Sequence, residues 1–231
     1  MAIIHQTTLV PAKVELLAGW LPAQPWYLPT GQPPDLARIG GFRLDDPAGA
    51  VGIEFMAVTD GSGERATIYQ VPLTYRAEAC AEAEAGFLGT AEHGVLGRRW
   101  IYDGVRDPVL AAQLVALIQG GAQAQAQRVS NTPDPTVVSA PVPGGPLTGT
   151  GSAVAADGPH GTDLRIQTAG PDGTPGGDLL VRVHRILAPD SAGDPAARGA
   201  AWVTAPWPQP DGTQVRGLWA TAHPDPARTP G

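Results

Sequence analysis

The stretch from Phe87 to Leu117 constrains the fold most, because it combines strand, turn and helix signals in one short run. Polar and apolar side chains alternate around Trp100, which indicates a strand, and an Asp-Gly pair then predicts a turn. Asp107 and Pro108 are typical of a helix start, since Asp caps free N–H groups and proline fits the first helical position. The apolar stripe that follows predicts an amphipathic helix. The stretch therefore predicts a strand, a turn and a packed helix, in this order.

The region before this stretch predicts an antiparallel meander together with a helix. Hairpin signals such as Asp-Gly-Ser-Gly connect segments in which apolar side chains alternate. Strands are expected over residues 2–10, 38–44, 51–58 and 66–76, and a helix over 12–21. Pro72 must lie at a sheet edge or a bulge, because proline has no N–H to donate. Residues 77–86 predict a helix or an exposed loop.

The second half of the chain has a different composition. The sequence has 30 glycines and 25 prolines, and they crowd into this half. Residues 131–160 are expected to form a Gly/Pro-rich connector, with one short strand at 136–139. Residues 161–223 show period-2 alternation between turn signals and predict a small, mostly-β region. Residues 224–231 are expected to be a disordered tail.

Charge and composition argue against several functional classes. The net charge is −7 and no basic patch with interleaved aromatic residues occurs, so we expect no nucleic-acid partner. No run of apolar residues is long enough for a transmembrane helix, and the N-terminus does not read as a secretory signal. Cys80 is the only cysteine and cannot form an internal disulfide. We therefore expect a cytoplasmic protein without a membrane partner.

No set of residues in the sequence matches a known catalytic pattern. The five histidines are scattered without metal-ligand spacing, and the G-x-S-x-G pattern of serine hydrolases is missing. Cys80 has no neighbouring histidine that would activate its thiol. The Gly-rich run at 144–151 lacks the lysine of a phosphate-binding loop, and we interpret it as part of the connector. We expect no enzyme activity, no cofactor and no metal.

Two interpretations are open for the aromatic residues. Aromatic rings stack on sugars and arginines donate to hydroxyl groups, but aromatic side chains also fill protein cores. Glu92 and His93 do not suit an acid–base pair, because neighbouring residues of a strand point to opposite faces. The candidate ligand-binding residues are Trp26, Tyr27, Arg98, Arg99, Trp100 and Tyr102.

Three segments resemble the N-terminal cap domain of bacterial maltokinases. WLPAQPWY at 20–27 is similar to the W-L-P-x-Q-R-W-F opening of that domain, although Pro25 stands where the family has arginine. YQVPLTYR at 69–76 and TAEHGVLGRRWIYDGVRDPVLAAQLVALI at 90–118 resemble its remainder, in the same order. For residues 1–130 the resemblance implies an α+β domain, in which a curved antiparallel sheet packs with helices in a cystatin-like arrangement.

A weaker resemblance links GDLLVRVHRIL at 177–187 to the region that follows the cap in these kinases. There a strand similar to L-V-V-K-V-F-R-R-L carries a lysine that contacts the nucleotide phosphates. Arg182 stands at that position here, and the only lysine in the chain is Lys13. No H-G-D-x-H-x-x-N loop and no D-F-G equivalent follow, although phosphoryl transfer needs such metal-binding and positioning groups.

The resemblance implies a stand-alone cap protein associated with α-glucan, maltose or trehalose metabolism in an actinobacterium-like cytoplasm. We expect a non-catalytic binding or regulatory module that docks a sugar kinase or another α-glucan enzyme, or that binds maltodextrin. A first alternative is a degenerate maltokinase-like fragment in which Arg182 contacts nucleotide. A second alternative is a scaffold or oligomerisation protein whose strand edges pair between copies.

Overall fold

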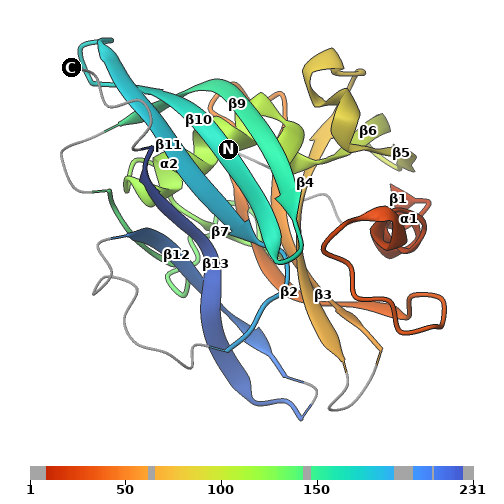
Figure 1. The fold of residues 1–231 in the computed structure, drawn as a ribbon. Coiled ribbons are helices and arrows are strands. Elements are labelled where there is room, and N and C mark those ends of the chain that lie inside the picture. Colours follow the sequence, from red (N-terminus) through yellow and green to blue (C-terminus); the bar gives the residue numbers. More distant parts are fainter. Residues whose placement is uncertain (1–8, 62–65, 143–146, 190–199, 210, 226–231) are drawn as a thin grey trace.

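Two antiparallel sheets with a long helix in their shared core form the molecule (Figure 1). The computed structural model describes residues 9–61, 66–142, 147–189, 200–209 and 211–225. In order across the first sheet, the strands are β1 (Leu9–Val10), β5 (Phe87–His93), β6 (Gly97–Asp103), β4 (Thr67–Arg76), β3 (Gly52–Asp60), β2 (Leu36–Leu44) and β7 (Gln125–Ala126). The second sheet runs β8 (Val138–Ala140), β12 (Ala201–Pro208), β13 (Gln214–Pro224), β11 (Pro175–His184), β10 (Gly161–Ala169) and β9 (Thr148–Gly158).

The expected α+β class is wrong, because the protein is mostly β. Of the described residues, 51% lie in strands and only 16% in helices, and the helices do not form a layer of their own. The α-helices are α1 (Lys13–Trp20) and α2 (Pro108–Ile118), with short 3-10 turns η1 (Leu21–Ala23), η3 (Ala81–Gly86) and η4 (Gly104–Arg106). The prediction over-weighted two helical patterns, whereas a second sheet nearly as large as the first follows them along the chain.

Helix α2 begins and ends where the sequence predicts. The Asp107 carboxylate accepts a hydrogen bond of 2.9 Å from the Val109 N–H, and Pro108 is the first helical residue. None of the eleven residues of α2 is exposed, although the sequence predicted burial on one stripe only. The difference arises because β9 also covers the helix. A Cβ atom on Gly149 of β9 would lie 3.1 Å from the Cα of Ala112, so the glycine allows this close approach.

The two sheets are joined by backbone pairing as well as by packing. After β11 the chain runs along the edge of β4, where Ile186 pairs with Tyr69 and the Leu187 N–H donates to the Ile68 carbonyl at 2.8 Å. Pro72 lies between this pairing and the start of the β4–β6 pairing at Leu73, as its missing N–H requires. The C-terminal sheet therefore packs on the N-terminal one in a single hydrophobic core.

The range expected as a connector, residues 131–160, contains strands β8 and β9. The predicted strand at 136–139 corresponds to β8, whereas β9 was not foreseen because its residues are small and lack an apolar alternation. Residues 2–8 of the first expected strand and 226–231 of the expected tail lie outside the described residues. The domain boundaries themselves stay a prediction.

The first sheet is covered on both faces, so β3 is buried almost throughout. One face packs on α2 and the second sheet, and the other packs on α1. Glu54 of β3 points to the α1 side and accepts hydrogen bonds from Lys13, from Tyr75 at 2.7 Å and from Gln127 at 2.8 Å. Burial raises the pKa of this carboxyl, but Lys13, the Tyr75 hydrogen bond and the charge of Arg38 outweigh burial and hold the Glu54 pKa below its ordinary value. The only lysine of the chain therefore neutralises a buried carboxylate.

Candidate functional site

The β5–β6 hairpin carries the exposed members of the predicted binding set. Its register places Glu92 opposite Arg98 and Thr90 opposite Trp100, and each pair lies on the same face of the hairpin. Arg98 and Glu92 form an ion pair of 2.9 Å between exposed side chains, and Trp100 is half-buried. Phe87 continues this row beyond Trp100. We call Phe87, Thr90, Glu92, Arg98 and Trp100 the hairpin face.

The turn of the same hairpin exposes apolar side chains. The Val95 and Leu96 N–H groups donate to His93 Nδ1 at 3.3 and 3.0 Å, so the turn is held by local hydrogen bonds. Val95 is 61% exposed and Leu96 47% exposed, and Val10 of the neighbouring strand β1 is 64% exposed. We call Val10, Val95 and Leu96 the hairpin tip. Together with Phe87 they make up four of the eight large hydrophobic residues that are exposed in the described part of the chain.

Tyr102 and Arg99, two further candidates from the sequence, do not belong to the hairpin face. The Tyr102 side chain is fully buried beneath η3, and its hydroxyl accepts a hydrogen bond of 2.9 Å from the Cys80 N–H. Arg99 lies on the opposite face of β6 and donates to the Leu96 carbonyl at 2.5 Å. The Tyr102 ring is therefore not exposed for stacking, which alternation alone does not reveal, because η3 covers this end of the strand.

Trp26 and Tyr27 are also buried, between α1 and the first sheet. The Tyr27 hydroxyl donates to Asp60 at 2.8 Å, and burial together with this hydrogen bond raises the pKa of Tyr27 to about 12. Both rings pack against Tyr69, with centroid distances of 5.9 and 5.7 Å. Whether any member of the predicted set binds a ligand stays a prediction, but these two rings are not exposed for stacking.

Trp26 instead contacts a buried arginine that no sequence motif indicates. The Arg185 guanidinium lies 4.7 Å from the Trp26 ring centroid, in the geometry of a cation–π contact. The same guanidinium donates to the Asp103 carboxylate and, at 2.8 Å, to the Thr162 hydroxyl. Arg185 follows β11, so this contact fastens the second sheet to the first. No local sequence pattern predicts this contact, because Trp26 and Arg185 lie far apart in the sequence.

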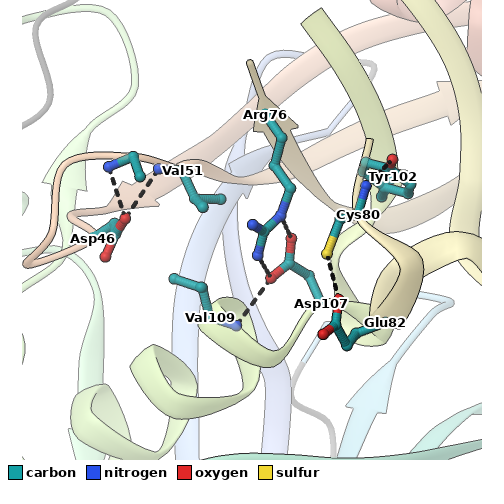
Figure 2. A network of polar contacts seen from close by, with 9 residues as sticks. Asp46, Val51, Arg76, Cys80, Glu82, Tyr102, Asp107 and Val109 are labelled. Carbon is teal, nitrogen blue, oxygen red and sulfur yellow. Dashed lines mark hydrogen bonds and ion pairs between the residues drawn. The ribbon is translucent and has the colours of Figure 1, made fainter. Parts of the chain in front are cut away.

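A second network fixes the start of α2 (Figure 2). Arg76 at the end of β4 donates twice to the Asp107 carboxylate, at 2.7 Å each, and Asp107 also caps the helix through Val109. The hydrogen bond from Cys80 to Tyr102 lies beside this pair (Figure 2). The side chain of Asp107 is fully buried and that of Arg76 is 20% exposed. These residues therefore have a structural role that joins strand, turn and helix.

A comparison with known families shows which domain this part of the chain resembles. Residues 20–107 match the family model of the maltokinase N-terminal cap domain. This part of the chain is similar to that cap domain, and we call residues 20–107 the cap-like domain. The match extends to the cap domain and not to a kinase catalytic domain. No curated protein matches the chain. The cap-like domain includes Trp26, Arg76, Asp107 and the whole hairpin, whereas Arg185 and the second sheet follow it.

Outside the cap-like domain, Arg182 stands at the position that resembles the nucleotide-contacting lysine of these kinases. It lies on the outer face of β11 and donates twice to Asp163 of β10, at 2.7 Å each. Both side chains are about half exposed, at 53% and 48%. The Arg182 guanidinium is therefore already paired with the Asp163 carboxylate. Of the Gly-rich run at 144–151, residues 148–151 begin β9 and residues 144–146 lie outside the described ranges.

His184, next to this pair in the chain, should make stability depend on pH. Burial, assisted by the charge of Arg182, lowers the pKa of His184 to about 4. Between the ordinary value of 6.5 and this value, the unfolded chain binds a proton that the folded protein rejects, so stability falls as pH falls. Urea unfolding should show a loss of about 2 kcal/mol between pH 7 and pH 5 that His184→Gln removes. An unchanged pH dependence in His184→Gln would contradict this assignment.

The described residues offer little else for a small ligand. Within the described ranges, no three His, Cys, Asp or Glu side chains are grouped as metal ligands. A shallow groove of about 400 Å³ lies between α1 and β2, lined by Leu9, Lys13, Leu36, Arg38 and Met56 among others. Of the helices that the structure describes, none is long and apolar enough to cross a membrane. We take the hairpin as the candidate binding surface, because its apolar and aromatic side chains are exposed.

Proposed function

We propose that the protein is a non-catalytic binding module of maltose, trehalose or α-glucan metabolism, and that its hairpin tip docks a partner enzyme of that metabolism. Exposed Val95 and Leu96 at the hairpin turn, together with exposed Val10 on the strand paired with β5, carry the proposal. Contiguous exposed apolar surface on a folded protein is typical of interaction sites. The similarity to a maltokinase cap supplies the metabolic context.

Two contacts weaken the alternatives. A nucleotide-binding role for Arg182 would require the bidentate bond to Asp163 to break. Pairing between copies through strand edges is hindered, because Arg106 donates to the Ala155 carbonyl of the edge strand β9 at 2.9 Å. Pro206 and Pro208 lie in the half of β12 beyond its pairing with β8, where they have no N–H to donate to a strand of another copy. A docking module therefore fits the described contacts better than a nucleotide-binding fragment or a scaffold.

Docking should depend on Leu96. An aspartate at this position places a charge in the apolar centre of the proposed interface. Leu96→Asp should therefore raise the dissociation constant by about tenfold or more. The measurement is biolayer interferometry against purified enzymes that act on maltose, trehalose or α-glucan. Val154→Asp is the matched control, because Val154 is 70% exposed on β9, outside the cap-like domain. The proposal fails if no such enzyme binds, or if both variants bind like the unmodified protein.

A further inference from the structure

We propose that the hairpin face is a subsite for an α-linked glucose oligomer. This deepens the proposed function, because it assigns a ligand class to the surface beside the hairpin tip. Along the hairpin face, Phe87 comes first, the opposed residues Thr90 and Trp100 come next, and the Glu92–Arg98 pair comes last. Aromatic residues offer flat apolar surface to the C–H face of a pyranose ring, and the polar members supply donors and acceptors for its hydroxyl groups.

The aromatic part of the row is held in place before any ligand binds. Trp100 packs against Cys80, Ala83 and Tyr102 and remains partly exposed. Phe87 is 39% exposed, and its ring lies 5.4 Å from that of Tyr102, centroid to centroid. Tyr102 is itself fixed by its bond from Cys80. Rings that are already immobilised lose little conformational entropy on binding. This favours a flat ligand that makes only weak contacts, such as a sugar.

The polar part of the row fits a neutral ligand better than a charged one. Glu92 and Arg98 neutralise each other, and their side chains are 59% and 62% exposed. A phosphate or a carboxylate would compete with Glu92 for the guanidinium, whereas a hydroxyl group can accept from Arg98 and donate to Glu92 at the same time. Thr90 adds a third hydroxyl-binding group on the same face. A neutral polyhydroxyl compound therefore matches the chemistry.

The shape of the hairpin face favours a sugar oligomer over a single sugar. The residues lie along an open strand surface rather than in a pocket, so a monosaccharide would bury little area there. Successive positions on one face of a strand are about 7 Å apart, which lets neighbouring pyranose units meet Trp100 and Arg98 in turn. The similarity to a maltokinase cap selects the α-linked glucose series among such ligands.

The test is calorimetric titration of the full chain with maltoheptaose, with cellohexaose as the β-linked comparison. We expect maltoheptaose to bind, Trp100→Ala to weaken binding about tenfold and Arg98→Ala to weaken it about fivefold. Arg182→Ala is the matched control, because Arg182 is another exposed arginine paired with a carboxylate, and it should leave binding unchanged. Circular dichroism checks the fold of each variant, and Arg98→Ala decides the matter if Trp100→Ala does not fold.

Three results would overturn the assignment. One is the absence of maltoheptaose binding up to about 10 mM. Another is binding that Arg98→Ala leaves intact, which would place the sugar elsewhere. The last is equal binding of cellohexaose, which would reject the α-linked series. Enzyme docking is measured separately through Leu96→Asp, so loss of the sugar subsite and loss of the docking function are distinguishable.

Discussion

Arg185→Met should lower the free energy of unfolding by about 3–5 kcal/mol, because it leaves the Asp103 carboxylate buried without its charged partner. Asp103 is 3% exposed and Arg185 is fully buried, so water cannot replace the lost interaction. The substitution also removes the cation–π contact with Trp26 and the hydrogen bond to Thr162. Urea unfolding followed by tryptophan fluorescence measures the change.

The pH dependence of this variant identifies the mechanism. Burial raises the pKa of Asp103 even in the presence of Arg185, which acts in the opposite direction. Without Arg185 the carboxyl should take up a proton more readily, so the penalty of Arg185→Met should shrink as pH falls. A penalty that is constant across pH would instead point to lost packing around Trp26.

A double substitution separates the pair from its surroundings. Replacing both partners of a buried ion pair with apolar residues is often nearly neutral, so Asp103→Leu combined with Arg185→Met should recover much of the lost stability. Among the described residues, Asp103 Oδ1 and Arg185 Nη1 have no hydrogen-bond partner, which limits the net stabilisation from the pair. If the double variant is as unstable as the sum of the single variants, the two residues do not act as a pair.

The sequence could predict those features that depend on neighbouring residues. The start of α2 follows from Asp107 and Pro108, whose capping and backbone effects act within one helical turn. The placement of Arg98 and Trp100 on one face follows from the period of two in a strand. These are local rules, so they hold whatever the rest of the chain does.

The features that the sequence could not predict depend on distant segments. Strand β9 consists mostly of glycine, alanine and threonine, and it exists because β10 pairs with it and α2 accepts its small residues at close range. Tyr102 is buried because η3 folds over it, and Trp26 because α1 and Arg185 cover it. Alternation and helical spacing describe one element at a time, so they cannot show which other element covers a face.

Gly41→Ala should be the most damaging small substitution in the first sheet, with a loss of about 3 kcal/mol or more. Gly41 has a φ of +133°, a conformation that residues with a side chain rarely adopt. A Cβ atom at this position would lie 2.0 Å from the Phe55 carbonyl oxygen, which is backbone and cannot rotate away. Relief of the clash would require β2 and β3 to separate at the centre of the core. Thermal and urea unfolding measure the loss.

The adjacent glycine provides the control for this prediction. A Cβ atom on Gly40 would meet only the Pro208 ring, at an ordinary contact distance of 3.8 Å, and Gly40 does not have a positive φ. Gly40→Ala should therefore change stability by less than about 1 kcal/mol, and the reduced entropy of the unfolded chain favours the variant. Equal losses at both positions would show that β2 tolerates no side chain at all here. A loss at Gly41 alone would show that the cap-like domain needs this one glycine so that β2 can follow β3 closely enough to close the shared core.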